Sequence, residues 1–191
     1  MTIQGEAVDA ELFGRAAGGD ERAFGELFER HAQAVWNHAY RLTGSWALAE
    51  DLTSNTFLIA WRKRAELKLI RDSALPWLYT VAGNLARTEH RGARRRLKLL
   101  TRIPEPPAVS DHADEVAAQL DGEARLKEVI AAVSGLPKAQ RQVVELCLLG
   151  DLPTADAAAL LEVAEVTVRS HLSRARAHLR ALLDEKTLED K

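Results

Sequence analysis

The sequence predicts an all-α protein made of two small helical domains joined by a flexible linker. Ala, Leu, Arg and Glu dominate the composition, and apolar residues recur at helical spacing with poor strand signals. One stretch, RIPEPPAVSDHADE at 102–115, interrupts this pattern with three prolines in four residues and is expected to be extended. A chain of 191 residues is long enough for two such domains, each with its own core.

The helices are delimited by glycine and proline clusters. Pro137 fits the first turn of a helix, where its missing N–H costs nothing. The apolar periodicity and these breaks predict the following helices: 7–17, 21–42, 46–65, 74–100, 112–134, 138–149, 154–161 and 165–183.

The composition excludes several classes of protein. Apolar runs such as residues 57–61 are five residues long, whereas a membrane span needs roughly 20, so no membrane insertion is expected. The single cysteine, Cys147, excludes an internal disulfide and a cysteine-cluster metal site, and its apolar surroundings indicate a core thiol. The histidines lack metal-ligand spacing, and there is no catalytic signature. We therefore expect a cytoplasmic protein that is not an enzyme and has no cofactor or metal.

Positive charge is concentrated in two segments, although the whole chain has a formal net charge of −2. Residues 61–102 contain 12 basic and three acidic residues, and residues 166–183 contain four arginines and no acid. Two separated cationic segments indicate two points of contact with one polyanion. The alternative is a pair of basic surface helices with no nucleic-acid partner.

The second cationic segment has the pattern of a DNA-reading helix. Val168, Leu172 and Ala175 begin an apolar stripe, while Arg169, Ser170, Ser173 and Arg174 share another face. An arginine there can pair with guanine in the major groove, and Thr167 can cap backbone N–H groups or contact phosphate. The short helix and tight turn before it complete a helix-turn-helix layout. The alternative is an amphipathic helix whose arginines only keep it soluble.

This C-terminal half resembles region 4 of the extracytoplasmic-function (ECF) sigma factors of bacterial RNA polymerase. The resemblance lies in Leu136-Pro137, Arg141 and the segment TVRSHLSRAR at 167–176. It implies that the last helix reads the −35 promoter element. The implied DNA contacts are Thr167, Arg169, Ser170, Ser173, Arg174 and Arg176. The chain departs from the family at Glu162 and Val166, where glycine is usual or frequent, and at 156–158, where Glu-Ile-Ala is usual.

The N-terminal half resembles sigma region 2. The resemblance lies in AFGELFER at 23–30, AEDLTSNTFLIAW at 49–61 and WLYTVAGN at 77–84. It implies that the helix near 46–65 docks on core polymerase through its outward face. The implied contacts are Asp51, Ser54, Asn55 and Leu58. The family usually has Gln-Glu where this chain has Ser54-Asn55.

The same resemblance implies that the helix near 74–100 and the loop 62–75 recognise and help to open the −10 element. Capture of a base flipped from the stack requires a cationic frame. The frame and helix residues are Lys63, Lys68, Arg71, Asn84, Arg87, Thr88, Arg91, Arg94 and Arg95. Trp77 and Tyr79 could stack on bases, but their apolar periodicity favours the core.

The predicted organisation is an N-terminal extension (1–20), region 2 (21–101), a linker (102–113), region 4 (114–183) and a tail (184–191). The partners implied by the resemblance are core RNA polymerase, promoter DNA and an anti-sigma factor. Two alternatives stay open. One is a stand-alone helix-turn-helix regulator without a polymerase-docking domain, and the other is a sigma factor that docks but melts DNA poorly.

Overall fold

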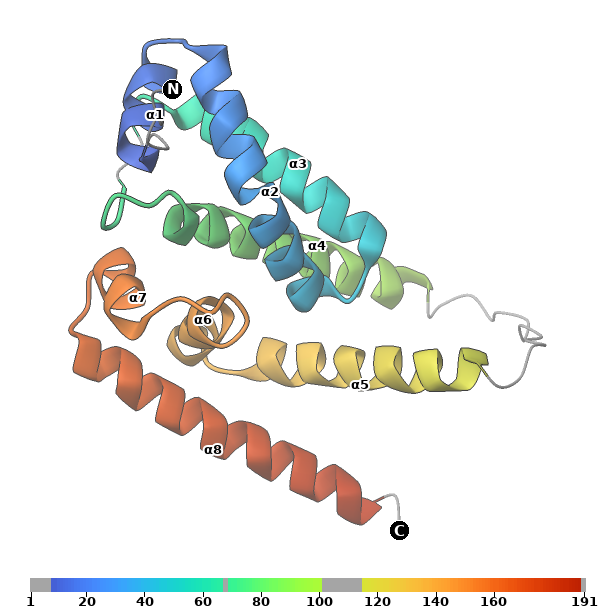
Figure 1. The fold of residues 1–191 in the computed structure, drawn as a ribbon. Coiled ribbons are helices and arrows are strands. Elements are labelled where there is room, and N and C mark those ends of the chain that lie inside the picture. Colours follow the sequence, from blue (N-terminus) through green and yellow to red (C-terminus); the bar gives the residue numbers. More distant parts are fainter. Residues whose placement is uncertain (1–7, 67–68, 101–114, 190–191) are drawn as a thin grey trace.

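The computed structural model describes residues 8–66, 69–100 and 115–189, and within these ranges the regular elements are α-helices (Figure 1). The helices are α1 (Asp9–Ala17), α2 (Glu21–Thr43), α3 (Trp46–Lys63), α4 (Leu75–Leu100), α5 (Glu115–Gly135), α6 (Lys138–Cys147), α7 (Thr154–Leu161) and α8 (Glu165–Glu189). The all-α prediction is confirmed, and α8 continues beyond 183, where the sequence pattern placed its end.

The first four helices form a bundle in which α2 is central and contacts α1, α3 and α4. Asp20 caps the start of α2 because its carboxylate accepts hydrogen bonds from the amides of Arg22 and Ala23. Gly44 ends α2 in the left-handed conformation, with a φ of 64° that suits glycine. Ser45 then caps α3. The predicted N-terminal extension therefore contains α1, a helix that packs onto this bundle.

The last three helices form the helix-turn-helix unit, with α6 and α7 both packed on α8. Val143 and Val144 of α6 and Val168 of α8 are almost fully buried in its core. The turn begins at Glu162, which adopts the left-handed conformation with a φ of 55°. This is one of the two positions where the resemblance leads us to expect glycine.

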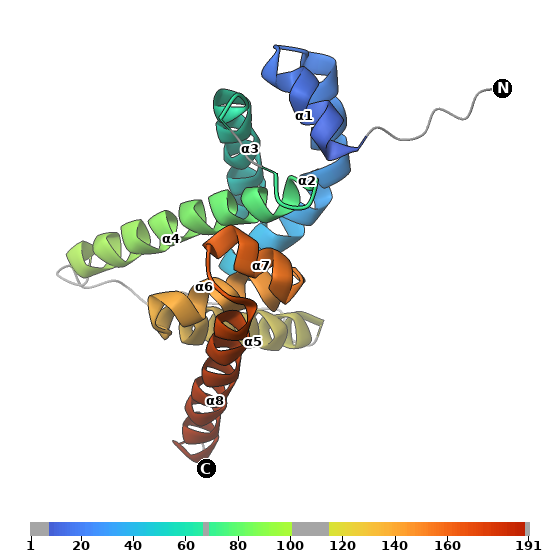
Figure 2. The same cartoon turned by 90° about the vertical axis from the view of Figure 1, so that its left-hand side faces the viewer.

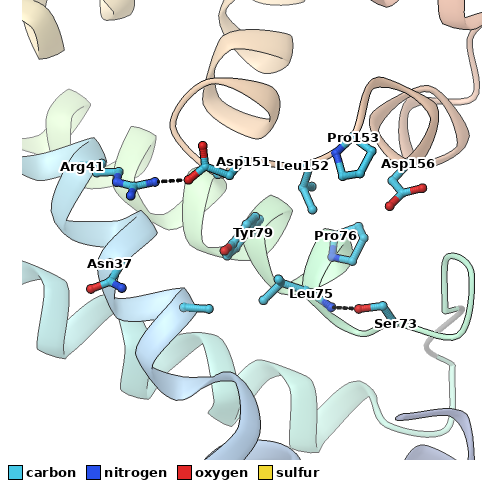
Figure 3. Close-up of a pocket in the computed structure, with 12 residues that line it drawn as sticks. Asn37, Arg41, Ser73, Leu75, Pro76, Tyr79, Asp151, Leu152, Pro153 and Asp156 are labelled. Atoms are coloured by element: carbon cyan, nitrogen blue, oxygen red, sulfur yellow. Dashed lines mark hydrogen bonds and ion pairs between the residues drawn. The ribbon is translucent and has the colours of Figure 1, made fainter. Parts of the chain in front are cut away.

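The two helical groups are in direct contact, and a continuous hydrophobic core includes residues of both. Near the end of α6, Arg41 of α2 donates hydrogen bonds to the Leu149 carbonyl at 2.8 Å and to Asp151 at 2.7 Å. Arg41 and Asp151 border a cleft of about 390 Å³ between the groups (Figure 3). Gly150 lies so close to Tyr79 that an added Cβ would stand 2.8 Å from the ring. The predicted linker, 102–113, lies outside the described residues.

Among the helices of the described ranges, none is long and apolar enough to cross a membrane.

Candidate nucleic-acid interface

The helix α8 separates an apolar face from a cationic one, as its sequence predicts. Val168, Leu172 and Ala175 are buried, whereas Arg169, Ser173, Arg174 and Arg176 are exposed. Thr167 and Ser170 are partly exposed beside them. The helix extends away from the first four helices, which leaves its cationic face open to a ligand (Figure 2).

The start of α8 is fixed by a short polar network. Glu165 accepts hydrogen bonds from the Thr154 hydroxyl at 2.6 Å and from Arg169 at 2.7 Å. These two hydrogen bonds lower the pKa of Glu165 below its ordinary value. Because Thr154 begins α7, the network joins the two helices of the helix-turn-helix and orients the first turn of α8.

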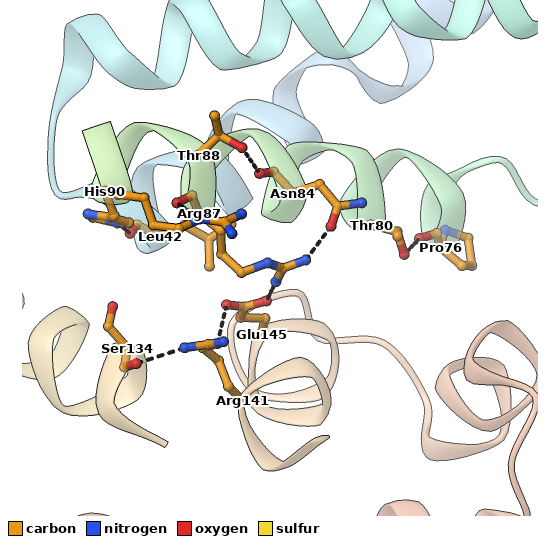
Figure 4. Close-up of polar contacts among 11 residues, drawn as sticks. Leu42, Pro76, Thr80, Asn84, Arg87, Thr88, His90, Ser134, Arg141 and Glu145 are labelled. Carbon is orange, nitrogen blue, oxygen red and sulfur yellow. Dashed lines mark hydrogen bonds and ion pairs between the residues drawn. The ribbon is translucent and has the colours of Figure 1, made fainter. Parts of the chain in front are cut away.

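The second predicted DNA-contacting face lies on α4. Asn84, Thr88, Arg91 and Arg95 are exposed along it, which places four of the predicted −10 residues on one surface. Arg87 differs because its guanidinium points toward α6 and pairs with Glu145 (Figure 4). Arg87 also donates a hydrogen bond to Asn84 Oδ1 at 2.6 Å. Two of the predicted base-reading side chains are therefore engaged within the chain in this arrangement.

Glu145 was not among the sequence-predicted residues, yet it connects the two helical groups. The whole residue is 7% exposed, and burial raises its pKa even though the neighbouring Arg87 and Arg141 favour the charged form. Arg141 is held in place by a hydrogen bond to the Ser134 carbonyl at 2.8 Å. The sequence signal that was overlooked is an acid inside the apolar run VVELCLL at 143–149.

Lys63, at the end of α3, and Arg71, in the loop before α4, are both exposed. Arg71 forms an ion pair with Asp156 of α7 at 3.2 Å. Lys68 lies outside the described residues, as does the side chain of Arg94. Tyr79 is 6% exposed and stacks on His38 with ring centroids 4.2 Å apart, so the core interpretation is confirmed for this tyrosine.

The predicted polymerase-docking residues share the outward face of α3. Asp51, Ser54 and Asn55 are exposed, and Leu58 is 44% exposed beside them. Leu52 and Phe57 are buried on the opposite face.

A groove of about 920 Å³ runs between α4 and the helices α5 and α6. Its lining is rich in cationic side chains, which include Arg87, Arg91, Lys127, Lys138 and Arg141. Within the described ranges, no group of three or more His, Cys, Asp or Glu side chains is placed to hold a metal ion.

Known proteins share both halves of this arrangement. Residues 27–96 match the family described as Sigma-70 region 2, and residues 126–179 match Sigma-70, region 4. The ECF RNA polymerase sigma factor SigL of Mycobacterium tuberculosis is 35% identical over 173 residues, which cover 89% of this chain and 94% of SigL. SigK of Mycobacterium bovis, also an ECF RNA polymerase sigma factor, is 29% identical over 91% of this chain and 92% of its own length.

Two solved structures are similar as well. CnrH, solved in complex with the cytosolic domain of CnrY, matches with a TM-score of 0.64 and 27% identity over 94% of this chain and 99% of its own. The sigma factor RpoE of Bartonella quintana, solved with the anti-sigma factor NepR, matches with a TM-score of 0.55 and 25% identity over 84% and 96%. On the evidence of both sigma-region matches and the identity with SigL, this chain belongs to the ECF group of the sigma-70 family.

Proposed function

We propose that this sigma factor binds core RNA polymerase in the cytoplasm, brings it to promoters through their −35 and −10 elements and assists local melting without being an enzyme. The observation that carries the proposal is the division of α8 into a buried apolar stripe and an exposed face with Arg169, Ser173 and Arg174. A helix of this kind fits the major groove, where arginine pairs with guanine and serine contacts phosphate or a base edge.

The −35 contacts in this proposal are Thr167, Arg169, Ser170, Ser173, Arg174 and Arg176. The −10 contacts are Lys63, Lys68, Arg71, Asn84, Arg87, Thr88, Arg91, Arg94 and Arg95. Because Arg87 is paired with Glu145, α6 must move away from α4 before this arginine reaches DNA. The proposal therefore includes a separation of the two helical groups on the polymerase.

Asp51, Ser54, Asn55 and Leu58 dock the chain on core polymerase in this proposal. Their exposure on one face of α3 supports it, as does the match to region 2, which a stand-alone helix-turn-helix regulator does not need. An anti-sigma partner is also proposed, because the similar RpoE was crystallised with one.

Transcription with purified core polymerase tests the proposal. The template is a DNA fragment selected from a random-sequence library by the reconstituted holoenzyme. Asp51→Arg should abolish co-purification with core, whereas Glu11→Arg, a matched reversal of an exposed acid on α1, should leave it intact. If core enzyme binds neither the wild-type chain nor the variants, the regulator interpretation replaces this one.

The DNA-reading role of α8 has its own matched pair. Arg174→Ala should weaken binding to the selected −35 duplex by about 10- to 100-fold, as expected for loss of a bidentate base contact. Arg180→Ala removes an exposed arginine farther along the same helix and should have a much smaller effect. Equal losses for the two variants would mean that α8 contributes only general positive charge.

A further inference from the structure

The first residue of α1, Asp9, is a buried carboxylate that joins three segments of the chain. Its side chain is 6% exposed. One oxygen, Oδ1, accepts a hydrogen bond from Arg30 at 2.8 Å. The other, Oδ2, lies 2.7 Å from His31 Nε2 and accepts a hydrogen bond from the backbone N–H of Ala74 at 2.9 Å. Arg30 and His31 belong to α2, but Ala74 belongs to the loop that leads into α4.

Ala74 occupies the position from which α4 starts. Its carbonyl accepts the first backbone hydrogen bond of the helix, from the Leu78 amide at 3.0 Å, and the residue is completely buried. The N–H groups at the start of a helix have no partner within the helix, so the Asp9 carboxylate satisfies a donor that burial would otherwise leave unpaired. Figure 1 shows α1 beside this end of α4.

The turn immediately before Ala74 needs such support. Ile70 and Ser73 exchange backbone hydrogen bonds of 3.3 and 3.1 Å around the turn. Its two central residues, Arg71 and Asp72, both adopt positive φ angles, 50° and 59°, that are unfavourable for non-glycine residues. Backbone in such a conformation persists where surrounding contacts determine it. The hydrogen bond to Asp9 fixes the base of the turn, and Arg71 stands at its tip.

We propose that Asp9 is a positioning residue for −10 recognition, which fixes the turn carrying Arg71 and the first residue of α4 through the amide of Ala74. The inference rests on the proposed function, because it assumes that this loop and α4 contact the −10 element. It gives the predicted N-terminal extension a role that requires no contact with DNA or polymerase. The hydrogen bonds to Ala74 and Arg30 also keep the pKa of Asp9 low despite its burial, so the carboxylate is charged at neutral pH.

The test compares Asp9→Asn with Arg30→Gln in the reconstituted holoenzyme. The asparagine keeps the size of the side chain but replaces the charged acceptor of the Ala74 N–H with a neutral amide, whose single oxygen cannot serve Ala74 and Arg30 at once. The Arg30 variant removes the contact to Oδ1 and leaves the Ala74 contact in place. The probe is a forked DNA with a single-stranded −10 segment, taken from the fragments selected by the wild-type holoenzyme.

Asp9→Asn should bind this fork about tenfold more weakly, which corresponds to the difference between a hydrogen bond to a charged acceptor and one to a neutral amide. It should keep wild-type affinity for core polymerase and for the isolated −35 duplex, and Arg30→Gln should bind the fork within about twofold of wild type. Unchanged fork binding by Asp9→Asn would overturn the inference, as would an equal loss by both variants. Failure of the wild-type chain to bind core or select DNA would instead refute the proposed function.

Amide hydrogen exchange in the wild-type chain gives a second readout that needs no variant. The Ala74 amide should be as well protected as the amides of α1, because both depend on the docking of α1. Rapid exchange at Ala74 while α1 stays protected would also overturn the inference.

Discussion

His38 makes the stability of the chain depend on pH. Its side chain on α2 is 1% exposed and stacks on Tyr79 beneath the segment where the two helical groups meet. Burial lowers the pKa of His38 from its ordinary value of 6.5 to about 4. The Leu149 backbone opposes this shift in part, and the nearby charge of Arg41 adds to it. The folded chain therefore keeps this imidazole neutral over a range of pH in which the unfolded chain protonates it.

The sign and size of the effect follow from proton linkage. Below pH 6.5 the unfolded state binds a proton that the folded state excludes, so stability is fully present above pH 6.5 and is lost as pH falls toward 4. Between pH 7 and pH 5, His38 alone should lower the free energy of unfolding by about 2 kcal/mol. The full loss, reached below pH 4, is about 3 kcal/mol.

Urea unfolding followed by circular dichroism at both pH values measures this effect. His38→Phe keeps an aromatic ring against Tyr79 but cannot titrate, so it should lose about 2 kcal/mol less stability than wild type between pH 7 and pH 5. His178→Gln, which replaces an exposed histidine of α8, should behave like wild type. Carboxylates also titrate in this range, but they are the same in wild type and in His38→Phe. Equal losses of stability for the two proteins would therefore refute the reasoning.

Three further predictions concern the turn and the contact between the helical groups. Glu162→Gly should raise the free energy of unfolding by about 1 kcal/mol. Glycine adopts the left-handed conformation found at this position without strain, whereas glutamate does not. The control is Ala159→Gly in the preceding helix, which should lower the free energy of unfolding by about as much. Thermal denaturation measures the stability of both variants. Gly150→Ala should destabilise the chain by about 1–3 kcal/mol in the same assay, because its Cβ would stand 2.6 Å from a backbone oxygen. Glu145→Gln removes the ion pair that joins α4 to α6, so the two helices should separate more readily in the isolated chain. Arg87 should then strengthen the chain's binding of single-stranded DNA several-fold, measured by fluorescence anisotropy. The reasoning for the turn is wrong if Glu162→Gly destabilises the chain, and the reasoning for the close contact is wrong if Gly150→Ala stabilises it. Unchanged DNA binding by Glu145→Gln would contradict the reasoning for Arg87.

The helices and their faces could be predicted because they depend on local periodicity. The apolar stripe of α8 and the outward residues of α3 appear in the structure as the spacing of Val168, Leu172, Asp51 and Asn55 predicts. The special geometry at Glu162 was visible only as a departure from a family pattern. Its left-handed backbone could not be derived from the residue itself, since glutamate rarely adopts it.

The contacts between segments far apart in the sequence could not be predicted. Arg87 and Glu145 are 58 residues apart, and their pairing depends on how two helices pack. Asp9 did leave a signal in the sequence, because it shares the helical spacing of Leu12, Phe13 and Ala16 and so stands on the buried face of α1. An acid on an apolar stripe indicates a buried partner, but the spacing does not identify the Ala74 amide as that partner.

The pairing of Arg87 with Glu145 has a consequence for how salt acts on this sigma factor. Both side chains are mostly shielded, at 20% and 9% exposed, so dissolved ions screen their attraction less than they screen contacts with DNA phosphates at the surface. As ionic strength rises, the chain should therefore dissociate from nucleic acid before the contact between α6 and α4 weakens. If Arg87 contacts the promoter as proposed, the Arg87–Glu145 pair must break first, and added salt alone should do little to break it.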